Sequence, residues 1–153
     1  KAMINIAHGE GFGLPLFDAA AAGLPIITVD WSGQTDFLYV PTKDKKGRIK
    51  PKSHFLKVEY DVLPVQQEAV WDGVIQADAK WAYPKEGSYK MALRKMLNNH
   101  DVYQGLANKL KVWTNEEFKP ENQYSRFVEA MEPHLKTPDS WKAEIEDIIQ
   151  YHE

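Results

Sequence analysis

The chain has 153 residues, no cysteine and a net charge of −3, which suits one globular domain and excludes a disulfide framework and any thiolate site. The acidic balance argues against a general nucleic-acid binder. The five histidines are scattered without a His-x-x-x-His pair, and no apolar run approaches the roughly 20 residues of a membrane span, so we expect no metal site and a cytoplasmic location.

The first predicted unit is a strand, a glycine-rich loop, a helix and a second strand. Residues 2–7 are mostly apolar and predict a short buried strand. Pro15 suits the first position of a helix, residues 16–22 are good helix formers, and Gly23 suits a left-handed cap. Residues 26–29, Ile-Ile-Thr-Val, predict a second buried strand, so the unit is a βαβ crossover.

The loop between the first strand and the helix has a composition that suits a phosphorylated ligand. Gly11 and Gly13 allow the backbone to approach a ligand closely, and N–H groups at a helix start attract an anion. Glu10 precedes the loop, and Asp18 lies about one turn into the helix. Two carboxylates that flank a phosphate cradle favour a ligand with central phosphates and hydroxyl-rich ends, such as a sugar nucleotide.

The same stretch carries a motif. From Glu10 it reads Glu-Gly-Phe-Gly-Leu-Pro, with an acid eight residues after Glu10 and then Ala-x-x-Gly-x-Pro before the second strand. This pattern resembles the signature of the retaining glycosyltransferases of family 4, which have the GT-B fold. The match runs from residue 10 to about residue 38, and the order and length of the chain stay compatible with the family to about residue 135.

The resemblance implies a role for each motif residue. Glu10 corresponds to the first acid of the family's Glu-x7-Glu motif, which contacts the donor sugar and would be catalytic here. Asp18 takes the place of the second acid, which binds the ribose hydroxyls, and it is one methylene shorter than the usual Glu. Gly33 resembles a glycine that the family often carries after the second strand. The loop amides that bind the sugar and the diphosphate in the family belong here to Gly11, Phe12, Gly13 and Leu14.

The resemblance also implies a fold and a function. The fold class would be α/β, with a partial parallel sheet, flanking helices and a helical C-terminal section. Residues 1–135 would form part of a Rossmann-like, nucleotide-sugar-binding lobe, residues 136–153 a C-terminal helix, and the acceptor lobe would be absent. The whole enzyme would transfer a sugar from a UDP- or GDP-type donor to a sugar, glycan, lipid or protein acceptor with retention of configuration. We expect no metal or other cofactor, no nucleic-acid partner, peripheral membrane contact at most, and no transferase activity from this chain alone.

Other interpretations remain open at this point. Glu10 could be a solvated acid at a strand end, Asp18 could complement the helix dipole at roughly 0.3–1 kcal/mol, and the glycines could serve turns only. The chain could also be a non-catalytic nucleotide-sugar-binding module on a GT-B-like lobe. An epimerase or a phosphorylase of the same fold is a further alternative, disfavoured by the glutamate motif and by the lack of a pyridoxal-binding lysine motif, respectively.

The middle of the chain predicts loops and an exposed strand. Residues 30–38 follow the second strand, so they should lie at the same sheet edge as Glu10, with Asp36 as a turn or cap residue. Residues 42–53 are basic and predict a solvated hairpin with Gly47 at its tip, although an anionic acceptor or a membrane could also contact them. Residues 56–62 alternate as a half-exposed strand, inside an insertion bracketed by Pro41 and Pro64.

The last part of the chain predicts helices. Residues 65–79 are ambiguous between a loop and a short helix, and Trp81 to Pro84 resemble an aromatic anchor that packs against the next helix. Ser88, Asp101 and Pro120 should begin three helices, and a fourth should start near Pro138. The apolar stripes of the first three should pack in the core. They are Tyr89, Leu93, Met96 and Leu97, then Val102, Leu106, Leu110 and Trp113, then Tyr124, Phe127, Val128 and Met131.

Overall fold

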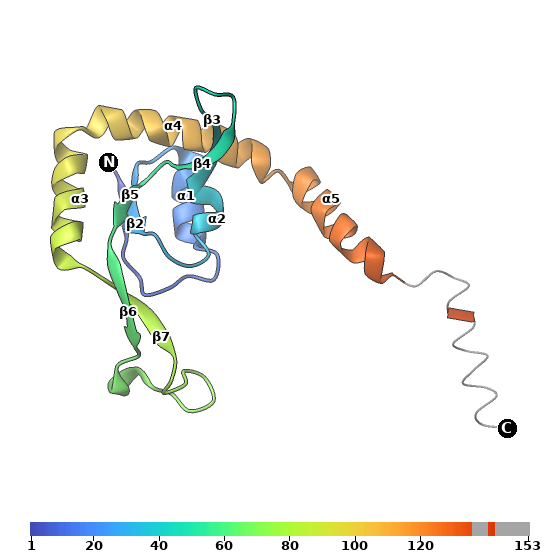
Figure 1. Ribbon diagram of the computed structural model, residues 1–153, viewed down its shortest axis with the longest axis horizontal. Helices are drawn as coiled ribbons and strands as arrows, with labels where there is room; N and C mark the ends of the chain where they lie inside the picture. The colour runs from blue at the N-terminus through green and yellow to red at the C-terminus, as the bar shows by residue number, and fades with distance from the viewer. Residues whose placement is uncertain (136–140, 143–153) are drawn as a thin grey trace. The chain divides into compact units, whose positions relative to one another are not determined.

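The computed structural model describes residues 1–135, 141 and 142, and it has a mixed α/β fold built on three parallel strands (Figure 1). The strands lie in the order β1, β2, β5. Their bounds are Met3–Asn5, Ile26–Val29 and Leu56–Val58. The predicted α/β class, with a partial parallel sheet and flanking helices, is therefore confirmed.

The chain divides into two compact units, Lys1–Glu116 and Glu117–Glu153, and the sheet lies in the first. The predicted lobe (residues 1–135) and C-terminal helix (residues 136–153) use a different boundary, and their assignment stays a prediction. The helix expected near Pro138 falls mostly outside the described residues. Only residues 141 and 142 of this predicted helix are described, and both are helical.

The predicted βαβ crossover is confirmed. Helix α1 (Leu14–Ala22) joins β1 to β2, and these two strands are parallel. Gly23 ends the helix with φ 82°, a left-handed conformation, and its N–H donates to the Ala20 carbonyl at 3.0 Å. Glycine adopts this conformation without steric cost, which is why the predicted cap was correct. Helix α1 contacts both β1 and β2.

One hydrophobic cluster ties the sheet to helix α3 (Glu86–Asn98). Alternate residues of β2 and β5 point to the same side, and the cluster consists of Ile27, Val29, Leu56, Val58, Ala92 and Met96. A second buried group comes from α1 and from α2 (Thr35–Leu38), with Leu16, Phe37 and Leu38 fully buried. These residues hold the loops that follow β1 and β2.

Two antiparallel hairpins extend the first unit. One pairs β3 (Tyr39–Lys43) with β4 (Ile49–Ser53), and the other pairs β6 (Tyr60–Pro64) with β7 (Lys80–Pro84). The 3-10 helix η1 (Gln67–Ala69) lies in the loop of the second hairpin. The predicted basic hairpin is confirmed, with Gly47 in its turn at φ 77°.

The single strand predicted over residues 56–62 is wrong. The chain leaves the parallel sheet after β5 and continues as β6 into the second hairpin (Figure 1). Apolar and polar residues alternate through both β5 and β6 because both strands are extended. This alternation does not show which strand each of them pairs with. The bracketed insertion is therefore also wrong in part, because β5 is a strand of the central sheet.

The helix starts and stripes need correction. Ser88 lies inside α3 and accepts the Glu59 N–H at its Oγ, 2.9 Å, so it does not cap the helix. Leu97 is 80% exposed. Helix α4 (His100–Glu117) starts before Asp101, and Val102 is 62% exposed while Leu110 is buried. No helix among the described residues is long and apolar enough to cross a bilayer.

The third helix begins at Pro120 as predicted, but its apolar stripe is not core in the described structure. Helix α5 (Pro120–Met131) is followed by the 3-10 turn η2 (Glu132–His134). The four stripe side chains are all exposed: Tyr124, Phe127, Val128 and Met131. Periodicity shows that a helix has an apolar side, not what covers that side.

Acidification is expected to destabilise the first unit through His54. This side chain is 5% exposed, and its Nδ1–H donates to the Lys52 carbonyl at 2.7 Å. Burial lowers the pKa of His54 below its usual value, so the unfolded chain takes up the proton first. The free energy of unfolding should therefore fall as the pH drops below about 6.5. Above about pH 6.5, the contribution of His54 to the free energy of unfolding should be constant. Between about pH 7.5 and 5.5, the melting temperature should fall less steeply for His54→Gln than for the wild type. Parallel plots of melting temperature against pH would show that His54 does not cause the acid sensitivity.

Candidate functional site

The loop that carries Glu10 lies at the carboxyl ends of the parallel strands, beside the loop that follows β2 (Figure 1). Ser32 joins the two loops, since its Oγ donates to the Glu10 carbonyl at 2.6 Å and accepts the Glu10 N–H at 3.1 Å. The Gly33 N–H also donates to the Glu10 carbonyl, at 3.1 Å. The sequence correctly predicted this shared edge, which is where ligands bind in open α/β sheets.

Asn5, the last residue of β1, positions the carboxylate of Glu10. Its Nδ2 donates to Glu10 Oε1 at 2.7 Å, and its Oδ1 accepts the Ala7 N–H at 2.8 Å. Glu10 is half-buried, and within the described residues the structure gives its Oε2 no hydrogen-bond donor. The carboxylate is therefore held by one oxygen, and its other oxygen can accept a further hydrogen bond.

The N-terminus of helix α1 lies next to Glu10. Gly13 is the N-cap residue with φ 85°, and among the described residues no side chain caps this end of the helix. A Cβ atom built on Gly13 would stand 3.7 Å from the Glu10 Cβ and 3.1 Å from the Gln34 Cβ. The Cβ of Glu10 therefore lies close to the N-terminus of the helix, where the partial positive charge is.

Phe12 fixes the loop to the helices beneath it. Its ring centroid lies 5.3 Å from that of Phe17 and 5.1 Å from that of Phe37, and the latter two rings meet edge to face. Phe37 is fully buried in α2. The side chain of Phe12 is therefore an anchor, and its expected ligand contact is one of the backbone.

Position 33 requires glycine because the backbone there packs directly against the backbone of Gly11 and Phe12. A Cβ atom at this position would stand 1.9 Å from the Gly11 carbonyl oxygen and 2.9 Å from the Phe12 Cα. The sequence predicted a turn glycine, but the left-handed residue of this turn is Ser32, with φ 75°. The donor contact expected for Gly33 stays a prediction, because its observed partner is the loop itself.

Asp18 lies on the exposed side of α1, beyond its first turn. Within the described part of the chain its carboxylate makes no hydrogen bond or ion pair. Asp36 is exposed in the first turn of α2, and its N–H donates to the Gly33 carbonyl at 3.2 Å. This placement agrees with the turn or cap role predicted for Asp36, whereas the structure assigns Asp18 no partner of its own.

Sequence reasoning missed His8 as part of this site. Its Nδ1 lies 2.8 Å from the Ala82 carbonyl oxygen, which can only accept, so Nδ1–H is the donor. The ring stacks on Trp81 at 5.0 Å and contacts Tyr83 at 4.6 Å. These contacts join β7 to the Glu10 loop. The packing of the same aromatic residues against the next helix stays a prediction. No spacing rule connects residues so far apart in sequence.

A charged hollow of about 340 Å³ opens at the same edge, where β2 and β5 end. Lys57 Nζ donates to Asp30 Oδ2 at 2.8 Å, and the Tyr39 hydroxyl donates to the same carboxylate at 2.7 Å. Burial raises the pKa of Tyr39 above its usual value, with its hydrogen bond to Asp30 acting in the same direction. The hollow is lined by Asp30, Lys57, Val58, Glu59, Tyr60 and Lys85.

Within residues 1–135, 141 and 142, no group of three or more His, Asp or Glu side chains could hold a metal ion. In comparisons with known proteins, no family model, no curated protein and no solved structure matches this chain. The functional conclusion therefore depends on the site residues and their geometry.

Proposed function

We propose that this chain forms the donor-binding part of a retaining glycosyltransferase with a GT-B-like fold, and that its site binds a nucleotide-diphosphate sugar. One observation supports the proposal most strongly. Glu10, whose carboxylate accepts a hydrogen bond from Asn5 at 2.7 Å, has its Cβ close to Gly13, the N-cap of α1, at the carboxyl edge of the sheet. A helix N-terminus favours phosphate, and a carboxylate favours hydroxyl groups, so both suit a ligand that carries phosphate next to a sugar.

In this proposal the loop binds the diphosphate and Glu10 binds the sugar. The amides of Gly11, Gly13 and Leu14 lie where charge develops on the departing diphosphate, and fixed dipoles stabilise such charge without reorganisation. Glu10 Oε2 would accept hydrogen bonds from sugar hydroxyls and hold the ring so that an acceptor attacks the anomeric carbon from the side of the leaving group. The proposed reaction needs neither a metal ion nor a nucleic acid.

Asp18 separates nucleotide recognition from sugar recognition. If its exposed carboxylate binds ribose hydroxyls, Asp18→Asn should weaken binding of free UDP or GDP by about tenfold or more, because charge-assisted hydrogen bonds contribute roughly 1.5–3 kcal/mol. Asp18→Glu should also change the affinity, because the carboxylate reaches one methylene further. Calorimetric titration of the nucleoside diphosphates measures both effects.

Asp36→Asn is the matched control, because Asp36 is also an exposed helical acid near the loop. Its affinity for both nucleotides should equal that of the wild type. Equal affinities for wild type, Asp18→Asn and Asp18→Glu would remove Asp18 from the site.

A further inference from the structure

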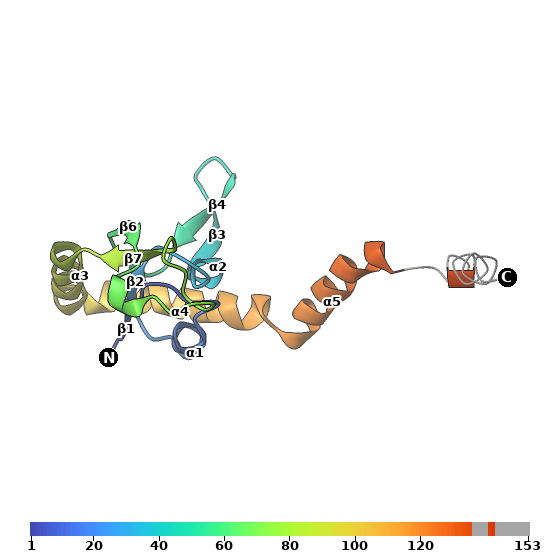
Figure 2. The same ribbon diagram turned by 90° about the horizontal axis from the view of Figure 1, so that it is seen from below.

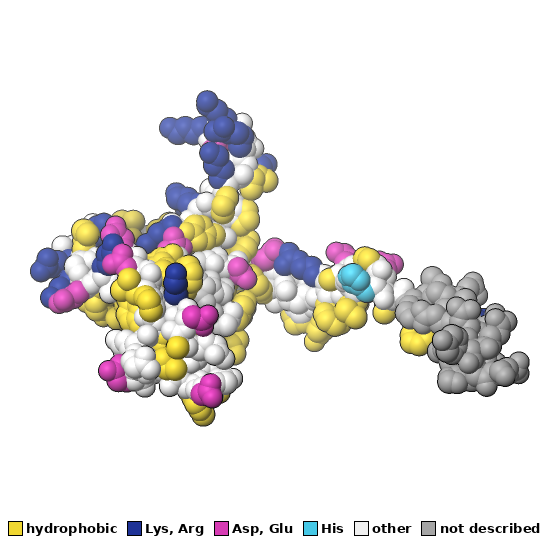
Figure 3. All heavy atoms as spheres, turned by 60° about the horizontal axis from the view of Figure 1, so that its bottom comes forward, with side chains coloured by type: hydrophobic (Ala, Val, Ile, Leu, Met, Phe, Trp, Pro, Cys, Tyr) yellow, Lys and Arg dark blue, Asp and Glu magenta, His cyan; other side chains and the backbone are white. Residues whose placement is uncertain are grey.

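The β3–β4 hairpin concentrates positive charge on a chain whose net charge is negative. Residues 43–52 contain six basic side chains and one acid, whereas the whole chain carries −3. The hairpin projects away from the parallel sheet (Figure 2), and Figure 3 shows Lys and Arg side chains gathered over this projection. The rest of the chain is therefore more acidic than its net charge indicates, and the positive charge is local to the hairpin.

Asp44 accepts hydrogen bonds from the turn at the tip of the hairpin, and its charge is balanced there by Arg48. Its Oδ1 accepts the N–H groups of Lys46 at 2.8 Å and Arg48 at 3.0 Å, and its Oδ2 accepts Arg48 Nε at 2.9 Å. The Arg48 N–H lowers the pKa of Asp44, so the pair is charged at neutral pH. Five exposed lysines have no ion pair with any described acid: Lys43, Lys45, Lys46, Lys50 and Lys52.

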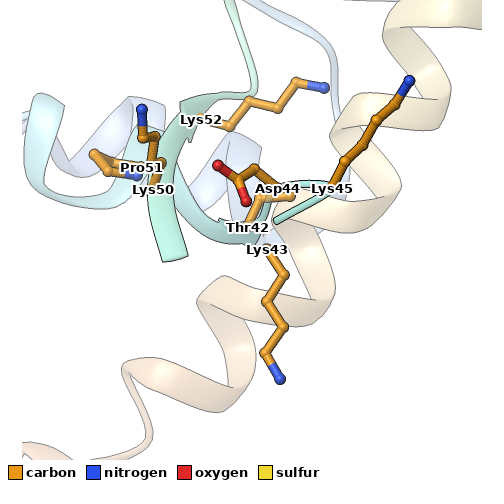
Figure 4. A pocket seen from close by; sticks show the side chains of 7 residues that line it. All are labelled: Thr42, Lys43, Asp44, Lys45, Lys50, Pro51 and Lys52. Atoms are coloured by element: carbon orange, nitrogen blue, oxygen red, sulfur yellow. The ribbon is translucent and has the colours of Figure 1, made fainter. Parts of the chain in front are cut away.

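These lysines do not form a site for a small anion. A hollow of about 440 Å³ is lined by residues of both strands and by Asp44. Figure 4 shows the side chain of Lys43 pointing the opposite way from those of Lys45 and Lys52. A phosphate in that hollow would also face the Asp44 carboxylate, so the hairpin suits a partner that surrounds it with many negative charges.

The edges of the hairpin do not suit an added peptide strand. Pro41 pairs with Pro51 in the centre of the ladder, and proline has no N–H to donate to a further strand. Residues 40–53 also contain no aromatic side chain, so the projection lacks the stacking surface by which proteins bind single-stranded nucleic acid.

We propose that the β3–β4 hairpin binds the surface of a membrane that contains anionic lipids. Ile49 is 67% exposed near the tip, opposite Lys43 in the ladder. An apolar side chain surrounded by lysines suits the headgroup layer, where the lysines meet phosphates and the isoleucine reaches the acyl boundary. The inference does not depend on the proposed glycosyltransferase function.

Co-sedimentation of the full chain with lipid vesicles tests the proposal. Vesicles of phosphatidylcholine with about 30% phosphatidylserine should bind the chain at low salt, and vesicles of phosphatidylcholine alone should not. Raising the salt from about 0.1 M to 1 M shortens the Debye length from about 10 Å to 3 Å and should release most of the bound protein.

Two variants with the same change of charge locate the binding surface. Replacing Lys43, Lys45, Lys50 and Lys52 by glutamine should weaken binding by about a hundredfold or more, since each lysine at an anionic surface contributes about fivefold. Replacing Lys80, Lys95, Lys109 and Lys111, which are exposed outside the hairpin, should have less than a tenth of that effect. Ile49→Ser should weaken binding about three- to tenfold at unchanged salt sensitivity.

Three results would overturn the proposal. They are equal binding to neutral and anionic vesicles, equal losses in the two lysine variants, and tighter binding to polyuridylic acid than to anionic vesicles at the same salt. Each lysine variant should keep the wild-type melting temperature, because the substituted side chains are exposed. If the hairpin variant melts lower, the salt and lipid dependence of the wild type decides the question alone.

Discussion

Gly33→Ala is expected to destabilise the chain by about 3 kcal/mol and to abolish the ligand binding that we propose for the Glu10 loop. The new Cβ would meet the Gly11 carbonyl oxygen at 1.9 Å, and both partners are backbone atoms that cannot rotate away. Relief requires the two loops to separate, which breaks the hydrogen bond from the Gly33 N–H to the Glu10 carbonyl. Thermal or urea unfolding followed by circular dichroism measures the loss.

Gly11→Ala is the matched control for this prediction. A Cβ at Gly11 meets no atom within 4 Å, and its φ is not in the left-handed region. Its free energy of unfolding should stay within about 1 kcal/mol of the wild type. The two glycines lie on opposite sides of one backbone contact, so similar stabilities for both variants would refute the packing role of Gly33.

Glu10→Gln is expected to remove most of the affinity for a nucleotide sugar while it leaves the fold intact. The amide oxygen can still accept the hydrogen bond from Asn5 Nδ2, and the side chain is only half-buried, so stability should change little. The charge-assisted hydrogen bonds to sugar hydroxyls, worth roughly 1.5–3 kcal/mol, would weaken. Calorimetry should therefore show a loss of about ten- to hundredfold for UDP- or GDP-sugars and much less for the free nucleoside diphosphates.

Glu59→Gln provides the control for a general effect of charge, because Glu59 is an exposed acid at the same sheet edge. It should bind nucleotide sugars as the wild type does. Wild-type affinity in Glu10→Gln, or an equal loss in both variants, would show that Glu10 is a solvated surface acid.

The central part of the fold could be predicted because its signals are local. The crossover from β1 through α1 to β2 follows from a short apolar run, a proline at the helix start and a left-handed glycine at its end. The shared sheet edge of Glu10 and residues 30–34 follows from the parallel topology alone. The placement of Glu10, Gly13 and Gly33 at one edge of the sheet could therefore be predicted from the sequence.

The remaining contacts arise between segments that are distant in sequence. The bond from His8 to the Ala82 carbonyl and the stacking on Trp81 depend on where the second hairpin folds back, which no local pattern encodes. The alternating pattern over residues 56–62 did not show that β5 and β6 belong to different sheets, because strand pairing also depends on distant segments. Helix stripes reveal an apolar side but not its partner, so the exposed side of α5 could not be foreseen.

A titration followed by protein NMR tests the central claim most directly. UDP- and GDP-sugars are added at millimolar concentration to the ¹⁵N-labelled chain, because weak binding is sufficient for this readout. The proposal predicts shifts for the amides of Gly11, Gly13 and Leu14 and for the side-chain amide of Asn5, which lies 2.7 Å from Glu10 Oε1, and their loss in Glu10→Gln. If both nucleotide sugars leave these resonances unmoved, or move only resonances elsewhere in the chain, the site does not bind a sugar nucleotide.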